Sequence, residues 1–177
     1  MPIRIARTRR RDRDPRPENW QTVIAHRDSV LLADFDVFRN HLVLMEREKA
    51  LTRFRIRDFA SSAEHHIAMD EPVYTVRWGG NPEFDTRTLR YVYTSLVTPS
   101  TVYDYEMSTK QRELKKRQDV LGGYDPSQYA TERTWAKASD GVMVPVSLVY
   151  RKPLVKDGSR PMLLYSYGSY GSSTDPT

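Results

Sequence analysis

The chain has 177 residues, of which 38% are hydrophobic and 29% are charged, and its formal net charge is +5. No apolar run approaches the roughly 20 residues that span a bilayer, so we expect no membrane association. The absence of cysteine excludes a disulfide framework and a thiolate zinc site, and we expect a cytoplasmic protein.

The excess charge is concentrated in the first sixteen residues, which contain seven arginines and two aspartates. The other 161 residues carry 21 basic and 21 acidic side chains, a net charge of zero. An electroneutral body argues against nucleic-acid binding. Residues 1–17 lack apolar periodicity, so we predict that they form a disordered basic tail. The alternative is a basic arm that contacts nucleic acid or an acidic partner.

Eight short segments between Trp20 and Arg117 predict a mainly β structure. They are rich in Val, Tyr, Phe, Leu and Thr, and turn signals such as residues 34–36 and 48–50 separate them. The predicted strands are residues 30–33, 37–46, 51–57, 65–69, 73–78, 88–95, 101–106 and 112–117. Eight strands at a spacing of roughly ten residues fit two four-stranded propeller blades, and they fit a small β-sandwich as well.

The third of these segments alternates between two kinds of side chain, which indicates a strand with one buried face. Thr52, Phe54 and Ile56 form the face that we expect to be buried. The opposite face, which we expect to be a solvated edge, consists of Arg53, Arg55 and Arg57.

The last third of the chain has a different pattern. Two extended segments, residues 134–138 and 142–150, flank Ser139-Asp140-Gly141, in which Asp-Gly predicts a tight turn. An apolar strand is predicted at residues 162–167, directly before a glycine-bearing loop at residues 168–171. A hairpin followed by a buried strand and such a loop resembles the start of an α/β-hydrolase sheet, in which a loop helps to hold the oxyanion.

The residues of this region carry a more specific resemblance than their pattern does. They read SDGVMVPVSLVY and, further on, PMLLYSYGSYG. Together with LRYVYTS at residues 89–95, they resemble the oligopeptidase B branch of the prolyl oligopeptidase family of serine peptidases. That family combines a seven-bladed β-propeller with an α/β-hydrolase domain. The resemblance implies that the last propeller blades occupy residues 18–121 and the first hydrolase strands residues 122–177, with the boundary at Gly122-Gly123.

A serine peptidase of this type needs a nucleophile in a G-x-S-x-G turn, followed along the chain by an aspartate and a histidine. No serine of the chain has glycines two residues away on both sides. Ser139, Ser166, Ser169 and Ser173 have one such glycine, but every histidine lies upstream of them. Those histidines are His26, His41, His65 and His66. The catalytic triad is therefore absent, and we expect the chain to be inactive by itself.

The resemblance implies one residue of the family's site. Tyr167 stands directly before Gly168, at the position of the tyrosine whose hydroxyl donates to the oxyanion in prolyl oligopeptidases. A tyrosine with a pKa of about 10 is neutral at pH 7 and can donate one hydrogen bond. The alternative is an aromatic residue that packs at the end of a strand. Because His65 and His66 would point to opposite faces of a strand, they cannot chelate one ion, and we predict no metal and no cofactor.

The predicted function is therefore that of a fragment of a serine-type oligopeptidase. The resemblance implies that the complete enzyme cleaves short peptides after Arg or Lys. The alternative is a stand-alone β-rich interaction module whose basic arm binds an acidic partner.

Overall fold

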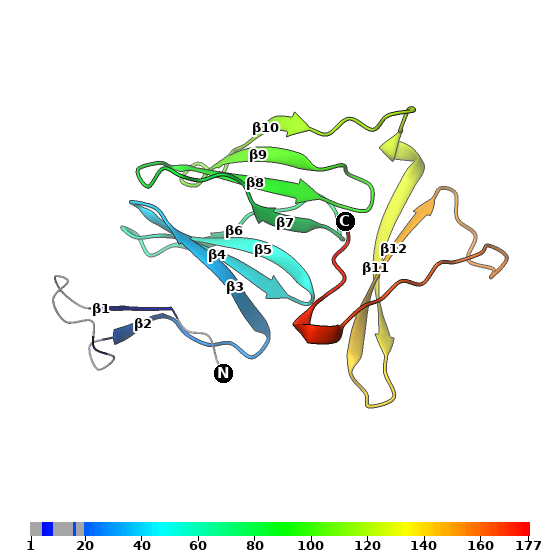
Figure 1. Cartoon of the computed structure of the whole chain (residues 1–177), viewed down its shortest axis with the longest axis horizontal. Helices are drawn as coiled ribbons and strands as arrows, with labels where there is room; N and C mark the ends of the chain where they lie inside the picture. Colours follow the sequence, from blue (N-terminus) through cyan, green and yellow to red (C-terminus); the bar gives the residue numbers. More distant parts are fainter. Residues whose placement is uncertain (1–4, 9–15, 17–19) are drawn as a thin grey trace.

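Two four-stranded antiparallel sheets make up most of the described part of the chain, which comprises residues 5–8, 16 and 20–177 of a computed structural model (Figure 1). The first sheet consists of β3 (Val30–Val37), β4 (His41–Glu48), β5 (Leu51–Asp58) and β6 (Glu64–His66). The second sheet consists of β7 (Thr75–Trp78), β8 (Thr88–Thr94), β9 (Thr101–Glu106) and β10 (Arg112–Arg117). Each strand pairs with its neighbour in sequence, as in the blade of a β-propeller. The prediction of a mainly β chain with about two blades is confirmed.

The two sheets pack against each other through their apolar faces. The ring of Phe54 on β5 lies 4.7 Å from that of Trp78 on β7 and 5.9 Å from that of Tyr91 on β8. Thr52, Phe54 and Ile56 are buried, as their alternation predicts. The whole buried cluster consists of Phe38, Val43, Phe54, Ile56, Ile67, Val76, Leu89, Tyr91, Tyr93, Tyr105 and Met107.

A smaller apolar cluster lies on the other side of the first sheet. Strand β1 (Ile5–Thr8) pairs antiparallel with β2 (Trp20–Ile24), and Ile24 contributes to this cluster. Its other buried members, which come from β3 and β4, are Leu32, Leu42 and Leu44. The disordered tail predicted at residues 1–17 is thus replaced at residues 5–8 by a strand. Except for residue 16, the rest of that prediction lies outside the described residues.

The first sheet differs from the predicted strands in two places. Residues 34–36, where a turn is predicted, belong to β3, in which they pair with Met45, Leu44 and Val43 of β4 after a shift of register between Leu32 and Asp34. The predicted strand at residues 37–46 is interrupted, and β4 begins only at His41. The backbone N–H of Phe38 donates to the carbonyl of His41 at 2.9 Å and closes a turn. Phe38 is buried in the core although it lies in this turn. Its apolar side chain is typical of a strand, so its residue type does not indicate the turn.

The arginines of β5 do not form the predicted solvated edge. Arg55 is only 8% exposed and donates to Glu46 from Nη2 at 2.6 Å and from Nε at 3.0 Å. It also donates to Glu64 at 2.6 Å. Arg57 reaches the carbonyl of Val23 on β2 at 3.3 Å. The prediction is wrong because β2 and neighbouring acidic side chains cover this face of the sheet.

The turn between β4 and β5 is a two-residue connection. Lys49 and Ala50 both have positive φ angles, 49° and 60°, as the right-handed twist of a tight hairpin requires. A guanidinium nitrogen of Arg47 donates to the carbonyl of Ala50 at 3.3 Å. The turn pairs Glu48 with Leu51 and leaves Lys49 at its tip.

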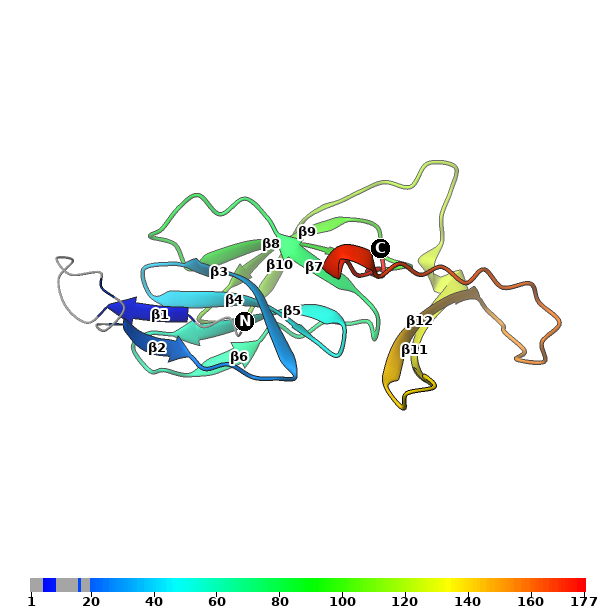
Figure 2. The same cartoon turned by 60° about the horizontal axis from the view of Figure 1, so that its bottom comes forward.

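A separate hairpin follows the second sheet. After the short 3-10 helix η2 (Pro126–Gln128), β11 (Tyr129–Lys137) pairs along its whole length with β12 (Met143–Arg151). The predicted tight turn is confirmed, since Gly141 has a φ of +88° and donates to the carbonyl of Ala138 at 2.9 Å. Figure 2 shows that this hairpin stands away from the two sheets and that the C-terminal segment runs back toward them.

The strand predicted at residues 162–167 does not form. These residues pair with no strand of the described part of the chain, and Leu163 is 91% exposed. An apolar strand needs hydrogen-bonded neighbours and a layer against its face. Within the described residues, β11 and β12 are paired only with each other. The segment is followed by a second short 3-10 helix, η3 (Ser169–Gly171). None of the helices in the described residues has the length and hydrophobicity that a membrane crossing requires.

Candidate functional site

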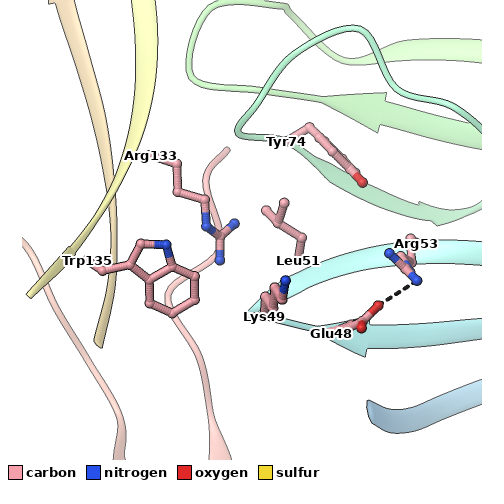
Figure 3. A pocket seen from close by; sticks show the side chains of 7 residues that line it. All are labelled: Glu48, Lys49, Leu51, Arg53, Tyr74, Arg133 and Trp135. Carbon is pink, nitrogen blue, oxygen red and sulfur yellow. Dashed lines mark ion pairs between the residues drawn. The ribbon is translucent and has the colours of Figure 1, made fainter. Parts of the chain in front are cut away.

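Three parts of the chain meet around a pocket of about 500 Å³. They are the β4–β5 turn, the residue before β7, and β11, which Figure 3 shows facing one another. Arg133 and Trp135 project from β11 because residues two apart on a strand share a face. The lining side chains are Glu48, Lys49, Leu51, Arg53, Tyr74, Arg133 and Trp135.

The pocket carries an excess of positive charge. Arg53 is neutralised by Glu48, whose carboxylate lies 2.5 Å from its guanidinium. Among the residues that the structure describes, no carboxylate forms an ion pair with Lys49 or Arg133. The guanidinium of Arg133 lies 5.3 Å from the ring centroid of Trp135. Burial lowers the pKa of Arg133, because its charge is partly removed from water without an acidic partner.

Aromatic and aliphatic side chains form the other walls. Tyr74 is half-buried and stacks on Tyr93 of β8, with ring centroids 5.9 Å apart. Burial raises the pKa of Tyr74, so its hydroxyl remains protonated and able to donate. Trp135 is 41% exposed and supplies a flat apolar surface opposite Leu51 (Figure 3). The pocket therefore combines apolar walls with two cations that have no carboxylate partner among the described residues.

The C-terminal segment of the chain docks beside this pocket. The carboxylate of Asp175 accepts two hydrogen bonds from the guanidinium of Arg47, at 2.6 and 2.9 Å. These bonds raise the pKa of Arg47. Pro176 is buried, and the hydroxyl of Thr75 donates to its carbonyl at 3.5 Å. An acidic segment of this chain thus lies across the junction between the first sheet and β7.

Tyr167 lies on the exposed segment between the hairpin and this docking point. It is 53% exposed, and its hydroxyl has no hydrogen-bond partner among the described residues. The hydroxyl of Thr174 donates to its carbonyl at 3.4 Å. Tyr170 is 99% exposed and has a φ of +57°, so the loop after Tyr167 turns sharply. Within the described residues, no hydrogen bond joins the side chain of Tyr167 to the serines and histidines singled out in the sequence.

The serines and histidines considered for a triad do not meet. In the described part of the chain no hydrogen bond joins a serine hydroxyl to a histidine ring. His65 contacts the hydroxyl of Tyr105 at 3.0 Å, whereas the neighbouring His66 lies 3.7 Å from a carboxylate oxygen of Glu46. The two rings thus have different surroundings, and burial lowers the pKa of both. No group of three or more metal-binding side chains occurs within the described residues.

Sequence reasoning missed the charged network around Glu46. This carboxylate is fully buried, and besides Arg55 it accepts a short hydrogen bond from Arg27. Its second oxygen has no hydrogen-bond partner within the described residues. Arg53 opposes Glu46 in the strand register, but the residue that pairs with it is Arg55, two positions further along the chain. The signal in the sequence is that acidic residues on β4 lie opposite arginines on β5. It can be recognised only when the register of the two strands is known.

The chain is similar to known peptidases in sequence. A family model described as "Prolyl oligopeptidase, N-terminal beta-propeller domain" matches residues 3–118. Dipeptidyl aminopeptidase BI of Pseudoxanthomonas mexicana is 44% identical over 160 residues, which are 90% of this chain and 22% of that protein. Protease 2 of Moraxella lacunata is 34% identical over 154 residues, which are 87% of this chain and 22% of that protein.

Solved structures give the same result for the fold. Oligopeptidase B from Trypanosoma brucei, in its closed form with covalently bound antipain, superposes with a TM-score of 0.82 at 33% sequence identity. The superposition covers 90% of this chain and 24% of the trypanosomal one. The chain thus spans less than a quarter of the length of these relatives.

Proposed function

Because this chain belongs to the prolyl oligopeptidase family, we propose that it is part of a serine-type oligopeptidase. In that enzyme, residues 18–121 contribute the last propeller blades. Residues 122–177 contribute the first strands of the catalytic α/β-hydrolase domain. In the complete enzyme the substrates are short peptides, cleaved after Arg or Lys as in oligopeptidase B. The lack of cysteine fits a cytoplasmic location. The chain alone is inactive, since it supplies no catalytic triad.

The extent of the structural likeness supports this assignment. The propeller family model ends at residue 118, whereas the match to trypanosomal oligopeptidase B covers 90% of the 177 residues, about 159 of them. At least part of the likeness therefore falls on the hairpin and the segment after it. A chain that continued from a propeller into an unrelated domain would match only as far as the last blade.

The exposed apolar segment also fits this function. Residues 162–167 read MLLYSY, and the side chains of Leu163, Leu164 and Tyr165 are exposed in this chain. Such residues form a buried strand when neighbouring strands and helices are supplied. We propose that the remaining catalytic domain supplies them and that Tyr167 then donates its hydroxyl to the oxyanion.

The test is a chimera in which residues 14–177 replace the matching part of the dipeptidyl aminopeptidase BI of Pseudoxanthomonas mexicana. Loss of one oxyanion donor costs on the order of 10²–10³ in rate. We expect Tyr167→Phe to lower kcat by about that factor and to change KM little, because the hydroxyl acts mainly in the transition state.

Two matched substitutions serve as controls. Tyr165→Phe and Tyr170→Phe each remove one hydroxyl from the same segment, and we expect kcat to stay within about threefold of the parent chimera. If Tyr167→Phe behaves like these neighbours, Tyr167 is only a packing residue. A soluble chimera without any peptidase activity would contradict the proposed function itself.

A further inference from the structure

The pocket between the β4–β5 turn, Tyr74 and β11 has a composition that selects a ligand. Lys49 and Arg133 are cationic and have no ion pair among the described residues. Anions are attracted most strongly by charges that are partly removed from water and not neutralised nearby. We propose that this pocket binds the carboxylate group of a short peptide.

The walls of the pocket argue for a peptide carboxylate over a small inorganic anion. Trp135, Tyr74 and Leu51 present apolar surface beside the two cations. A volume of about 500 Å³ lies within the range of sites that enclose small organic ligands. A carboxylate that follows an apolar side chain can therefore contact Arg133 while that side chain packs on Trp135.

The docked C-terminal segment gives a precedent for this mode of binding. Asp175 places its carboxylate on Arg47 with two hydrogen bonds, and the following Pro176 is buried. Arg47 directly precedes the pocket residues Glu48 and Lys49 in β4 and its turn. The same corner thus already holds a carboxylate next to a buried apolar residue, and the pocket beside it supplies cations for a second one.

The choice of a peptide as the ligand rests on the proposed function. In the complete oligopeptidase the pocket would hold one end or one acidic residue of a substrate, away from the bond that is cleaved. Such a site selects short peptides by where their negative charge lies.

Binding can be measured on the chain itself by nuclear magnetic resonance. The indole N–H groups of Trp20, Trp78 and Trp135 give three cross-peaks after ¹⁵N labelling, and Trp135→Phe identifies the one in the pocket. Three probes are titrated: acetyl-Ala-Ala-Leu with a free carboxylate, the same peptide as its C-terminal amide, and acetyl-Ala-Asp-Leu-amide. We expect the two acidic peptides to shift the Trp135 signal with a Kd below about 1 mM and the neutral amide to leave it unchanged. The tighter of the two acidic probes shows whether a C-terminal or a side-chain carboxylate is the ligand.

Substitutions then test the two cations. We expect Arg133→Gln to weaken binding by about tenfold, as for loss of a charge-assisted hydrogen bond. Arg133→Lys should weaken it less, because the charge remains but the planar guanidinium on Trp135 is lost. Lys49→Asn removes the second charge but suits the positive φ at this position, and should weaken binding about threefold. Lys116→Gln, which removes an exposed charge from β10, is the control and should have no effect.

Three outcomes would overturn the inference. They are equal binding of the neutral amide, no shift of the Trp135 signal at 5 mM peptide (about five times the expected Kd), and equal weakening by Lys116→Gln and Arg133→Gln. The signal of Trp78, whose ring packs against Phe54 of the core, reports whether each variant is folded. Because the readout is binding, an inactive chimera would leave this inference standing, and failure to bind would leave the proposed peptidase function standing.

Discussion

Apolar side chains of the same types are buried in the two sheets and exposed in the C-terminal third of the chain. Leu89 and Tyr91 on β8 have 0% exposure, whereas Leu163 is 91% exposed. Both segments favour extended structure by residue type. Strand β8 has hydrogen-bonded strands on both sides and another sheet against its face, whereas residues 162–167 have neither in the part of the chain that the structure describes. Strand-forming residues thus lead to burial only where a second layer is present.

The largest effect is expected in the shared core of the two sheets. Phe54→Ala should lower the free energy of unfolding by about 3–5 kcal/mol, because it leaves a cavity against Trp78 and Tyr91. Leu163→Ala should change it by less than about 0.5 kcal/mol. Urea unfolding followed by tryptophan fluorescence measures both. Equal costs would mean that the exposed segment is packed in solution and would break the comparison.

Removing a charged group should likewise cost more stability in the two sheets than in the C-terminal third of the chain. Glu46→Gln removes the fully buried counter-charge of Arg55, which then keeps only the partly exposed Glu64, and should destabilise the chain by about 2–3 kcal/mol. Its counterpart on the hairpin is Glu132→Gln, which breaks the exposed pair with Lys156 at 2.7 Å. There we expect a much smaller change, because water and salt screen an exposed pair. The measurement is the urea midpoint of each variant at one pH. Equal decreases for Glu46→Gln and Glu132→Gln would contradict the comparison.

Alkaline pH should destabilise the sheets through Tyr91. Burial raises the pKa of Tyr91 from 10.0 to about 12. Because the folded state holds this proton more tightly than the unfolded state, the resulting stability is fully present below pH 10 and is lost as the pH rises toward 12. The slope is about 1.4 kcal/mol per pH unit, and the total loss about 2–3 kcal/mol. Tyr91→Phe should reduce the slope between pH 9 and 12 by this one-proton contribution, and the exposed Tyr165→Phe should not. A residual slope is expected, because burial also raises the pKa values of Tyr74, Tyr93 and Tyr105. An unchanged slope in Tyr91→Phe would assign the alkaline transition to other groups.

The smallest effect concerns the link between the two regions. Arg47→Ala removes the ion pair with Asp175, which is only partly shielded from water, and should cost about 0.5–1 kcal/mol. Hydrogen exchange of residues 168–177, followed by mass spectrometry, should rise by up to about fivefold, since the segment detaches more often. The matched control is Lys156→Ala, which breaks an exposed ion pair between the segment after β12 and Glu132 of the hairpin. Unchanged exchange in Arg47→Ala would show that Pro176 alone holds the segment.

Much of the fold could be predicted from local patterns. The alternation at Phe54 and Ile56 identified a buried face, and Asp140-Gly141 identified the hairpin turn, because both signals depend on neighbours in the chain. The segment at residues 162–167 could not be judged this way. Its composition favours a strand, but whether a strand forms depends on partners that lie elsewhere.

Local sequence patterns predicted even less of the candidate site than of the fold. Tyr167 was singled out by its place before Gly168, and its catalytic role stays a prediction that the chimera tests. The pocket was not foreseen, because Lys49, Tyr74 and Arg133 are far apart in sequence and no spacing rule connects them.

The sequence by itself determined the mainly β character and the hairpin turn, since these follow from residue types and their order along the chain. Only the tertiary structure decided that the arginines of β5 lie in ion pairs, that residues 162–167 remain unpaired, and that two cations meet at an aromatic pocket. The physical reason is that burial and electrostatic pairing depend on distances between residues remote in sequence, which the register and packing of the sheets set.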